Sequence, residues 1–271
     1  LLRHVEPGTH FRVELIMKDA CKWFQRIGPD VAEIYSPPRI VQEAGLRSYG
    51  GRKLKPGWSL DLTVDDPETG RPWDLSDGKV RSKARELIKY GKPYMVICSP
   101  MCTAFSQIQN INKNRRDPDV IRRELDDAKD HLRFAMSICA TQHREHRYSL
   151  FEHPDGASSW QMPEVKKLMA TDCVETINMD MCAFGMTEMG EDGVRRPVQK
   201  ATRLMSLSPE ILKRLDVQCT NRTSKGDQQL REMYEKLNER IIAALLDHKW
   251  FDLAIETTEW CGLCTCIYGC Y

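Results

Sequence analysis

Short apolar runs alternate with longer segments of helical periodicity along most of the chain. Runs of strand length, apolar or alternating between apolar and polar residues, predict strands at 31–35, 58–64, 94–98, 148–152 and 173–179. Apolar positions three and four residues apart predict helices at 14–26, 39–46, 79–90, 117–142, 163–169, 208–215 and 227–248. The stretch 185–196, rich in glycine and acidic residues, is expected to be a loop.

Strands separated by helices of this length predict an α/β fold, in which a mostly parallel sheet carries helices on both faces. We expect a helical extension at 1–30, an α/β domain at 31–207 and a helical segment with a cysteine-rich tail at 208–271. Open sheets of this kind bind ligands beyond the carboxyl ends of their strands. The residues that directly follow each apolar run are therefore the first candidates for a functional site.

Composition and charge narrow the function classes. Of the 271 residues, 41% are hydrophobic and 29% charged, which is typical of a folded domain and not of a disordered or membrane protein. The 40 basic and 39 acidic residues nearly cancel, so contact with a nucleic acid would depend on a local basic patch. The chain has no secretion signal and no apolar run of membrane-spanning length, so we expect an intracellular protein without a membrane partner.

The chain contains eleven cysteines, most of them in apolar or helical stretches. We expect those at positions 21, 98, 139, 173 and 182 to be small buried residues with reduced thiols. The tail carries a CxxCxC-like cluster at 261–270 without a second ligand pair of zinc spacing, and we predict no metal there. The first residue is Leu, so we expect the chain to be part of a larger polypeptide.

The third apolar run leads directly into a cysteine, in the sequence VICSPMCTAFS at 96–106. A cysteine beyond the carboxyl end of a central strand is well placed to attack a ligand that lies across the sheet. A buried structural thiol is the alternative interpretation of Cys102.

The next apolar run ends in Phe151-Glu152-His153-Pro154, which brings a carboxyl group to the same edge of the sheet as Cys102. A carboxylic acid there could hydrogen-bond or protonate a ring nitrogen of a bound base. Cytosine does not accept a methyl group at C5 until a thiolate adds at C6, and protonation at N3 relieves the charge of that adduct. One thiol and one acid are what this reaction requires.

These two segments resemble the DNA cytosine-C5 methyltransferase family. Its fourth motif is a strand followed by Pro-Cys-Gln-x-Phe-Ser, which is similar to SPMCTAFS at 99–106, with Cys102, Phe105 and Ser106 matching. Its sixth motif ends a strand in Glu-Asn-Val, of which Glu152 matches. Its eighth motif, Gln-x-Arg-x-Arg, is similar to 199–203, where the first and last residues match.

The resemblance extends from about residue 31 to about residue 207 and implies a Rossmann-like class I sheet that binds S-adenosylmethionine. It implies that Cys102 attacks C6, that Glu152 holds or protonates N3, and that Arg203 helps to bind the base or a phosphate. Ser106 and Gln199 are the implied substrate contacts. DNA is the implied partner, and a nuclear location is expected if the source is eukaryotic.

The resemblance also implies where the cofactor binds. The family places it against the loop after the first strand, an acidic residue after the second strand, and an Asp before the third helix. The implied cofactor residues are Glu33, Tyr35, Ser36, Asp61, Asp74, Ser99 and Pro100. The loop glycines of the family are replaced here by Pro37 and Pro38, and a glycine loop is what lets a backbone approach the ligand closely.

The sequence leaves two other functions open. The chain also resembles methyltransferase-like domains of retroelement polyproteins, and the missing glycines favour a catalytically silent domain that binds nucleic acid within a polyprotein. Two further departures from the family, Met101 for the proline before the nucleophile and His153-Pro154 for Asn-Val, affect the same loop. The other alternative is a cysteine hydrolase in which Cys102 pairs with a histidine at position 131, 143, 146 or 153.

Overall fold

The computed structural model describes residues 28–48, 53–106, 115–184, 186–190, 192–197, 200–218 and 238–246. The predicted helix at 14–26, Gln199 and the cysteine-rich tail lie outside the described residues. Of the predicted helix at 227–248, residues 238–246 are described, and they are helical.

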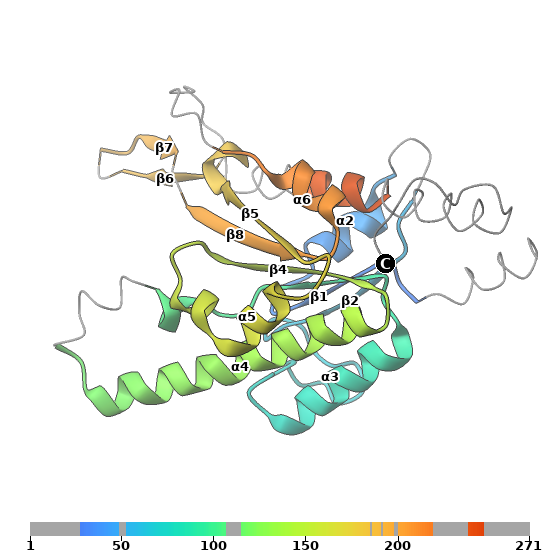
Figure 1. Cartoon of the computed structure of the whole chain (residues 1–271), viewed down its shortest axis with the longest axis horizontal. Coiled ribbons are helices and arrows are strands. Elements are labelled where there is room, and N and C mark those ends of the chain that lie inside the picture. The colour runs from blue at the N-terminus through green and yellow to red at the C-terminus, as the bar shows by residue number, and fades with distance from the viewer. Residues whose placement is uncertain are drawn as a thin grey trace, which may run out of the picture.

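A six-stranded sheet forms the centre of the described structure (Figure 1). Its strands are β1 (Val31–Ile34), β2 (Pro56–Leu60), β3 (Met95–Cys98), β4 (Tyr148–Pro154), β5 (Glu175–Asp180) and β8 (Ala201–Ser206). They are ordered β2-β1-β3-β4-β8-β5. Neighbouring strands are parallel from β2 to β4, whereas β8 is antiparallel to both β4 and β5. The predicted α/β fold with a mostly parallel sheet is confirmed.

Helices cover both faces of this sheet (Figure 1). On one face lie α3 (Gly78–Gly91), α4 (Pro118–Arg144) and α5 (Pro163–Met169). On the other face lie α2 (Ile40–Leu46), α6 (Pro209–Leu215) and the helical residues 238–246. Within the described part of the chain, no helix combines the length and the apolar character needed to cross a membrane.

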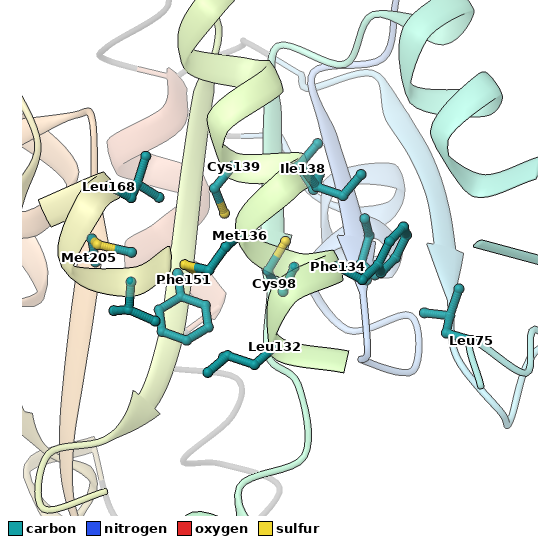
Figure 2. Close-up of a cluster of buried hydrophobic side chains, with 14 of the residues drawn as sticks. Leu75, Cys98, Leu132, Phe134, Met136, Ile138, Cys139, Phe151, Leu168 and Met205 are labelled. Atoms are coloured by element: carbon teal, nitrogen blue, oxygen red, sulfur yellow. The ribbon is translucent and has the colours of Figure 1, made fainter. Parts of the chain in front are cut away.

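The strands β1 and β3 are buried on both faces, as expected for parallel strands between two helical layers. In β3, Val96 and Cys98 face α3 and α4, whereas Met95 and Ile97 face the opposite layer. Figure 2 shows part of the hydrophobic core between the sheet and the helices α3, α4 and α5, in which Cys98 and Cys139 lie among apolar side chains. Both thiols are fully buried, as predicted.

The prediction of buried thiols is wrong at two other positions. Cys173 is exposed and has a left-handed backbone (φ 65°) in the turn before β5, and Cys182 is only half-buried. The strand predicted at 173–179 begins at Glu175 instead, because this turn occupies its first residues. A turn is a position that apolar periodicity alone does not reveal.

Other element boundaries in the structure also differ from the predicted ones. The strand predicted at 58–64 ends at Leu60, because the carboxylate of Asp61 accepts the backbone N–H of Thr63 (3.0 Å) and turns the chain. The predicted loop at 185–196 contains two short paired strands, β6 (Thr187–Met189) and β7 (Arg195–Pro197). The apolar and polar pattern did not predict β8, which lies inside the sheet.

Candidate active site

The strand order changes direction between β1 and β3. From β1 the chain goes to β2 on one side of the sheet, and β3 then pairs with β1 on the other side. Open α/β sheets bind ligands in the crevice beyond the carboxyl ends of two such strands. Two cavities lie there, and both are lined by Tyr35, which follows β1, and by Ser99, which follows β3.

The first cavity has a volume of about 380 Å³ and is lined by both Cys102 and Glu152. Five of the predicted cofactor residues line the same cavity, namely Glu33, Tyr35, Ser36, Ser99 and Pro100. The fold therefore brings the predicted nucleophile and the predicted acid to one space, from two strands that are direct neighbours in the sheet.

Cys102 lies between the end of β3 and a short 3-10 helix, η1 (Thr103–Phe105). Its carbonyl oxygen accepts the backbone N–H of Phe105 (3.0 Å), and the Phe105 ring is buried in the core below. Ser158 also donates a hydrogen bond to the carbonyl of Phe105 (3.3 Å). The segment is thus anchored on the side away from the cavity, and the Cys102 side chain remains half-buried at the cavity wall.

Glu152 faces the cavity because of the twofold periodicity of its strand. It is paired with Leu204 of β8, and both Leu204 and Leu150 line the same cavity. Burial raises the pKa of the Glu152 carboxyl above its ordinary value, and the positive charges of Lys200 and Arg39 oppose this only in part. The protonated acid is therefore favoured more strongly than in water.

Arg203 is not among the residues that line this cavity. In the antiparallel pair with β4 it lies opposite His153, so its side chain leaves the sheet on the other face from Glu152 and Leu204. Its guanidinium donates to Asp155 (Nε to Oδ1 2.7 Å) and lies 5.0 Å from the centre of the Trp160 ring. These contacts join β4 to β8 and give Arg203 a structural role.

Lys200 lines the cavity instead, and the sequence interpretation missed it. Lys200 precedes β8 with the same parity as Leu204, and so it lies on the cavity face. Its carbonyl oxygen accepts the backbone N–H of Met181 (3.1 Å), which fixes its position. Recognition of 201–206 as a strand with an alternating pattern would have identified Lys200 and not Arg203.

The second cavity has a volume of about 180 Å³ and is lined by both predicted acidic cofactor residues, Asp61 and Asp74. Its apolar lining includes Trp73 and Leu75. Hydrogen bonds from Ser76 lower the pKa of the Asp74 carboxyl, so Asp74 is ionised at neutral pH. Two carboxylates beside apolar side chains suit the hydroxyl and amino groups of a nucleoside.

Glu33 supports the loop that follows β1. Its side chain is 1% exposed, and its two oxygens accept the backbone N–H groups of Arg39 (3.0 Å) and Val41 (2.8 Å) and the hydroxyl of Ser36 (3.0 Å). These bonds hold the start of α2 against β1. Burial raises the pKa of the Glu33 carboxyl, and the hydrogen bonds oppose the rise.

We expect Glu33→Gln to destabilise the protein by about 1–3 kcal/mol, because the new amide NH2 would face N–H donors where an acceptor now lies. Chemical denaturation measures the free energy of unfolding. Glu86→Gln is the matched control, since Glu86 is an exposed carboxylate on α3. Equal stability of the two variants would contradict this structural role for Glu33.

His153 contacts the Cys102 segment from the face of β4 opposite to Glu152. Its ring is fully buried, stacks on Phe151 (centroids 5.6 Å apart) and meets Phe105 edge-on (5.7 Å). Its Nδ1 shares a hydrogen bond of 2.6 Å with the Ser159 hydroxyl. Burial lowers the pKa of His153 to about 4, so the ring is neutral at pH 7.

The other ring nitrogen of His153 is next to the loop that carries Cys102. Nε2 is buried and makes no hydrogen bond of ordinary geometry within the described residues, while the backbone groups of Met101 and Pro100 lie beside it. A buried polar atom of this kind calls for an explanation. We interpret His153 as a positioning residue for Cys102, which it supports from behind through Phe105 and the Pro100-Met101 backbone.

We expect His153→Leu to slow any reaction at Cys102 by up to about 100-fold, because a displacement of the nucleophile by about 1 Å has an effect of this size. The pH dependence of unfolding tests the burial of the neutral His153 ring without any measurement of activity. The pKa of His153 is depressed, so its contribution to stability is present above about pH 6.5 and is lost as the pH falls toward 4. The wild type minus variant difference in unfolding free energy should therefore shrink over this interval, and a constant difference would contradict a buried neutral ring.

The remaining predicted residues lie elsewhere. Ser106 follows η1 and is not among the cavity-lining residues, and Gln199 is outside the described residues. None of the described histidines lines the cavity that holds Cys102, and His131 lines the second cavity instead. The alternative of a cysteine hydrolase therefore gains no base from this geometry.

Among the described residues, no group of three or more His, Cys, Asp or Glu side chains could hold a metal ion.

Comparisons with known proteins found no relative of the chain. No family model matches the chain, and no curated protein or solved structure is significantly similar to it.

Proposed function

We propose that the chain transfers a methyl group from S-adenosylmethionine to C5 of cytosine in DNA. The observation that carries the proposal is the single cavity lined by Cys102 and Glu152, at the carboxyl ends of two neighbouring parallel strands. A thiol and a carboxyl group that line one cavity are the two groups that this reaction requires.

The roles of the two side chains follow from the chemistry of the base. Cys102 first gives up its proton to solvent, and its thiolate sulfur then forms a bond to C6, while the electron pair of the C5–C6 double bond shifts to C4–C5 and that of C4–N3 shifts onto N3. Glu152 donates its proton to N3, which neutralises the charge that would otherwise build up on N3 and O2. C5 is then nucleophilic enough to take the methyl group. Water removes the C5 proton, the electron pair left behind re-forms the C5–C6 double bond and expels the Cys102 thiolate, and N3 returns its proton to Glu152.

Lys200 supports the same reaction from the rim of the cavity. Its positive charge lowers the pKa of Glu152 and so opposes the larger effect of burial, and it lines the same space. A cation there favours a bound anion, either a phosphate of the nucleic acid or the charge that develops on the base.

The two adjoining cavities suit the cofactor as well. S-adenosylmethionine supplies the methyl group when it is bound. Asp61 and Asp74 would accept hydrogen bonds from its ribose and adenine groups in the second cavity, and Trp73 offers an apolar wall. The first cavity would take its amino-acid part beside Ser36 and Ser99. A Rossmann-like methyltransferase sheet with the cofactor across the switch point is part of this proposal.

Trapping with a modified substrate tests the proposal. Duplex DNA with 5-fluorocytosine in many sequence contexts is incubated with the protein and labelled S-adenosylmethionine. Because fluorine at C5 cannot leave as a proton does, the protein should stay bound through Cys102 in a complex that survives denaturation. Mass spectrometry would locate the adduct. If the wild-type protein binds the cofactor but forms no adduct with DNA or RNA, cytosine methylation is ruled out.

A catalytically silent domain that binds nucleic acid, within a mobile-element polyprotein, is the second candidate. The observation that favours it is the loop at Tyr35-Ser36-Pro37-Pro38, which lacks glycine and is held by Glu33. Calorimetric titration with S-adenosylmethionine separates the two candidates, because a silent domain has no need of the cofactor. Binding in the micromolar range would favour the enzyme.

A further inference from the structure

A two-stranded hairpin, β6 and β7, projects from the edge of the sheet at which the first cavity lies (Figure 1). β5 is parallel to β4, because both are antiparallel to β8, so β5 ends and β8 begins at the carboxyl edge of the parallel strands. The hairpin lies in the connection between β5 and β8. Both ends of this connection lie at the cavity, since Met181 and Lys200 line it and the backbone N–H of Met181 donates to the Lys200 carbonyl (3.1 Å).

One face of the hairpin is neutralised by its own charges. Glu188 lies opposite Arg196 in the strand pair, so both side chains are on this face. The Arg196 guanidinium also donates to the carboxylate of Asp192 (Nη1 to Oδ1 2.9 Å). Because cation and carboxylate satisfy each other here, this face has little attraction for a further charged partner.

The opposite face of the hairpin carries a cation and an apolar side chain. Met189 lies opposite Arg195, and Thr187 is on the same face two residues before Met189. Thr187 is 5% exposed, so this face is turned toward the domain at the base of the hairpin, whereas Met189 is 54% exposed further out. Arg195 donates to the Thr187 hydroxyl (Nη1 to Oγ1 3.4 Å), and no carboxylate among the described residues pairs with it. Its guanidinium has further N–H donors for a partner.

Exposed apolar side chains gather at this edge of the sheet. Val194, at the tip of the hairpin, is 52% exposed. Leu62 and Met101, which line the second cavity, are exposed as well. Exposed apolar groups that gather in one region mark an interaction site. A partner that matches both these groups and Arg195 must offer an anion beside an apolar surface, and a nucleic-acid strand does so with the phosphate and the base of each nucleotide.

We propose that the face of the hairpin formed by Met189 and Arg195 binds the nucleic-acid strand that carries the target base. Arg195 pairs with a phosphate, and Met189 packs against a base of the same strand. The inference rests on the proposed function, because this is the strand whose cytosine enters the cavity lined by Cys102 and Glu152. The hairpin contributes to the affinity for the substrate and not to the chemical step.

Binding of duplex DNA that contains 5-fluorocytosine, measured by fluorescence anisotropy over a range of salt concentrations, tests the inference. Arg195→Ala should weaken binding to every DNA sequence alike and should reduce the slope of log affinity against log salt concentration by about one. Arg195→Lys should keep the slope, because a lysine also pairs with a phosphate. Met189→Ala should weaken binding by about 3- to 10-fold and leave the slope unchanged.

The rate of covalent trapping separates binding from chemistry. Arg195→Ala and Met189→Ala should need more DNA for half-maximal trapping but reach the wild-type rate at saturation, because neither side chain touches the reacting atoms. Leu46→Ala and Lys89→Ala are the matched controls. These two exposed side chains lie near the ends of α2 and α3 that precede β2 and β3, at the opposite edge of the sheet, and both variants should bind DNA as the wild type does.

Met189→Ala decides the case in which Arg195→Ala does not fold, because the Met189 side chain is exposed. Equal affinity and equal salt dependence in the variants and the wild type would overturn the inference and leave the proposed function standing. A lower rate at saturating DNA with unchanged half-saturation would overturn it too, since the hairpin would then have a structural role. A wild type that binds DNA through Met189 and Arg195 but forms no adduct would overturn the proposed function and leave the hairpin surface standing.

Discussion

Cys102→Ser is expected to form no covalent complex with 5-fluorocytosine DNA and to lose at least about 10⁴-fold in methyl transfer, because a serine hydroxyl is a far weaker nucleophile than a thiolate. Cys102 lies at the cavity wall and its backbone is anchored through Phe105, so the substitution should leave the fold unchanged. Gel mobility of the denatured complex and transfer of labelled methyl groups both measure the effect.

The control for Cys102→Ser is Cys173→Ser. Cys173 is exposed in the turn before β5 and does not line either cavity, so this variant should react as the wild type does. Cofactor affinity, measured by calorimetry, should be the same in both variants. An adduct that forms normally in Cys102→Ser would assign the chemistry to another residue.

Glu152→Gln is expected to slow the covalent step by about 10²- to 10⁴-fold, because the amide can hydrogen-bond to N3 but cannot protonate it. Single-turnover trapping with saturating DNA measures this step apart from binding. The wild-type rate should fall as the pH rises through the raised pKa of Glu152, since only the protonated acid donates. A flat pH profile with a normal rate in the glutamine variant would remove Glu152 from the mechanism.

Glu152→Gln should slow the reaction but stabilise the fold at higher pH. The folded pKa of Glu152 lies above its ordinary value of 4.5, so its contribution is full below about pH 4.5 and is lost as the pH rises through the folded pKa. Above that pKa the buried charge costs free energy, and glutamine removes the cost. Glu152→Gln should therefore gain stability relative to the wild type as the pH rises. Greater stability of the wild type at alkaline pH would contradict this burial.

Much of the site could be predicted because its residues stand next to strongly apolar strands. The runs that became β1, β3 and β4 are buried on both faces, and such runs are the clearest signal in an α/β sequence. The residues directly after them had to reach the carboxyl edge of the sheet. Cys102 and Glu152 were identified in this way, and they line one cavity.

The sequence did not predict on which face of the sheet Arg203 and Lys200 lie. The motif resemblance singled out Arg203, but the side of a strand on which a residue lies depends on where the strand begins and with what it pairs. β8 was not predicted, so its parity was unknown, and the pairing with β4 turned Arg203 away from the cavity and Lys200 toward it. Spacing within a motif does not contain this information.

The sequence by itself determined the α/β class, the buried strands and the places of Cys102 and Glu152 at their ends, because periodicity and strand length are local properties of the chain. Only the tertiary structure decided that β8 lies between β4 and β5, that Tyr35 lines both cavities, and that the His153 ring packs against Phe105 in the segment after Cys102. These depend on strand pairing and side-chain packing between segments far apart in the sequence, which no local pattern specifies.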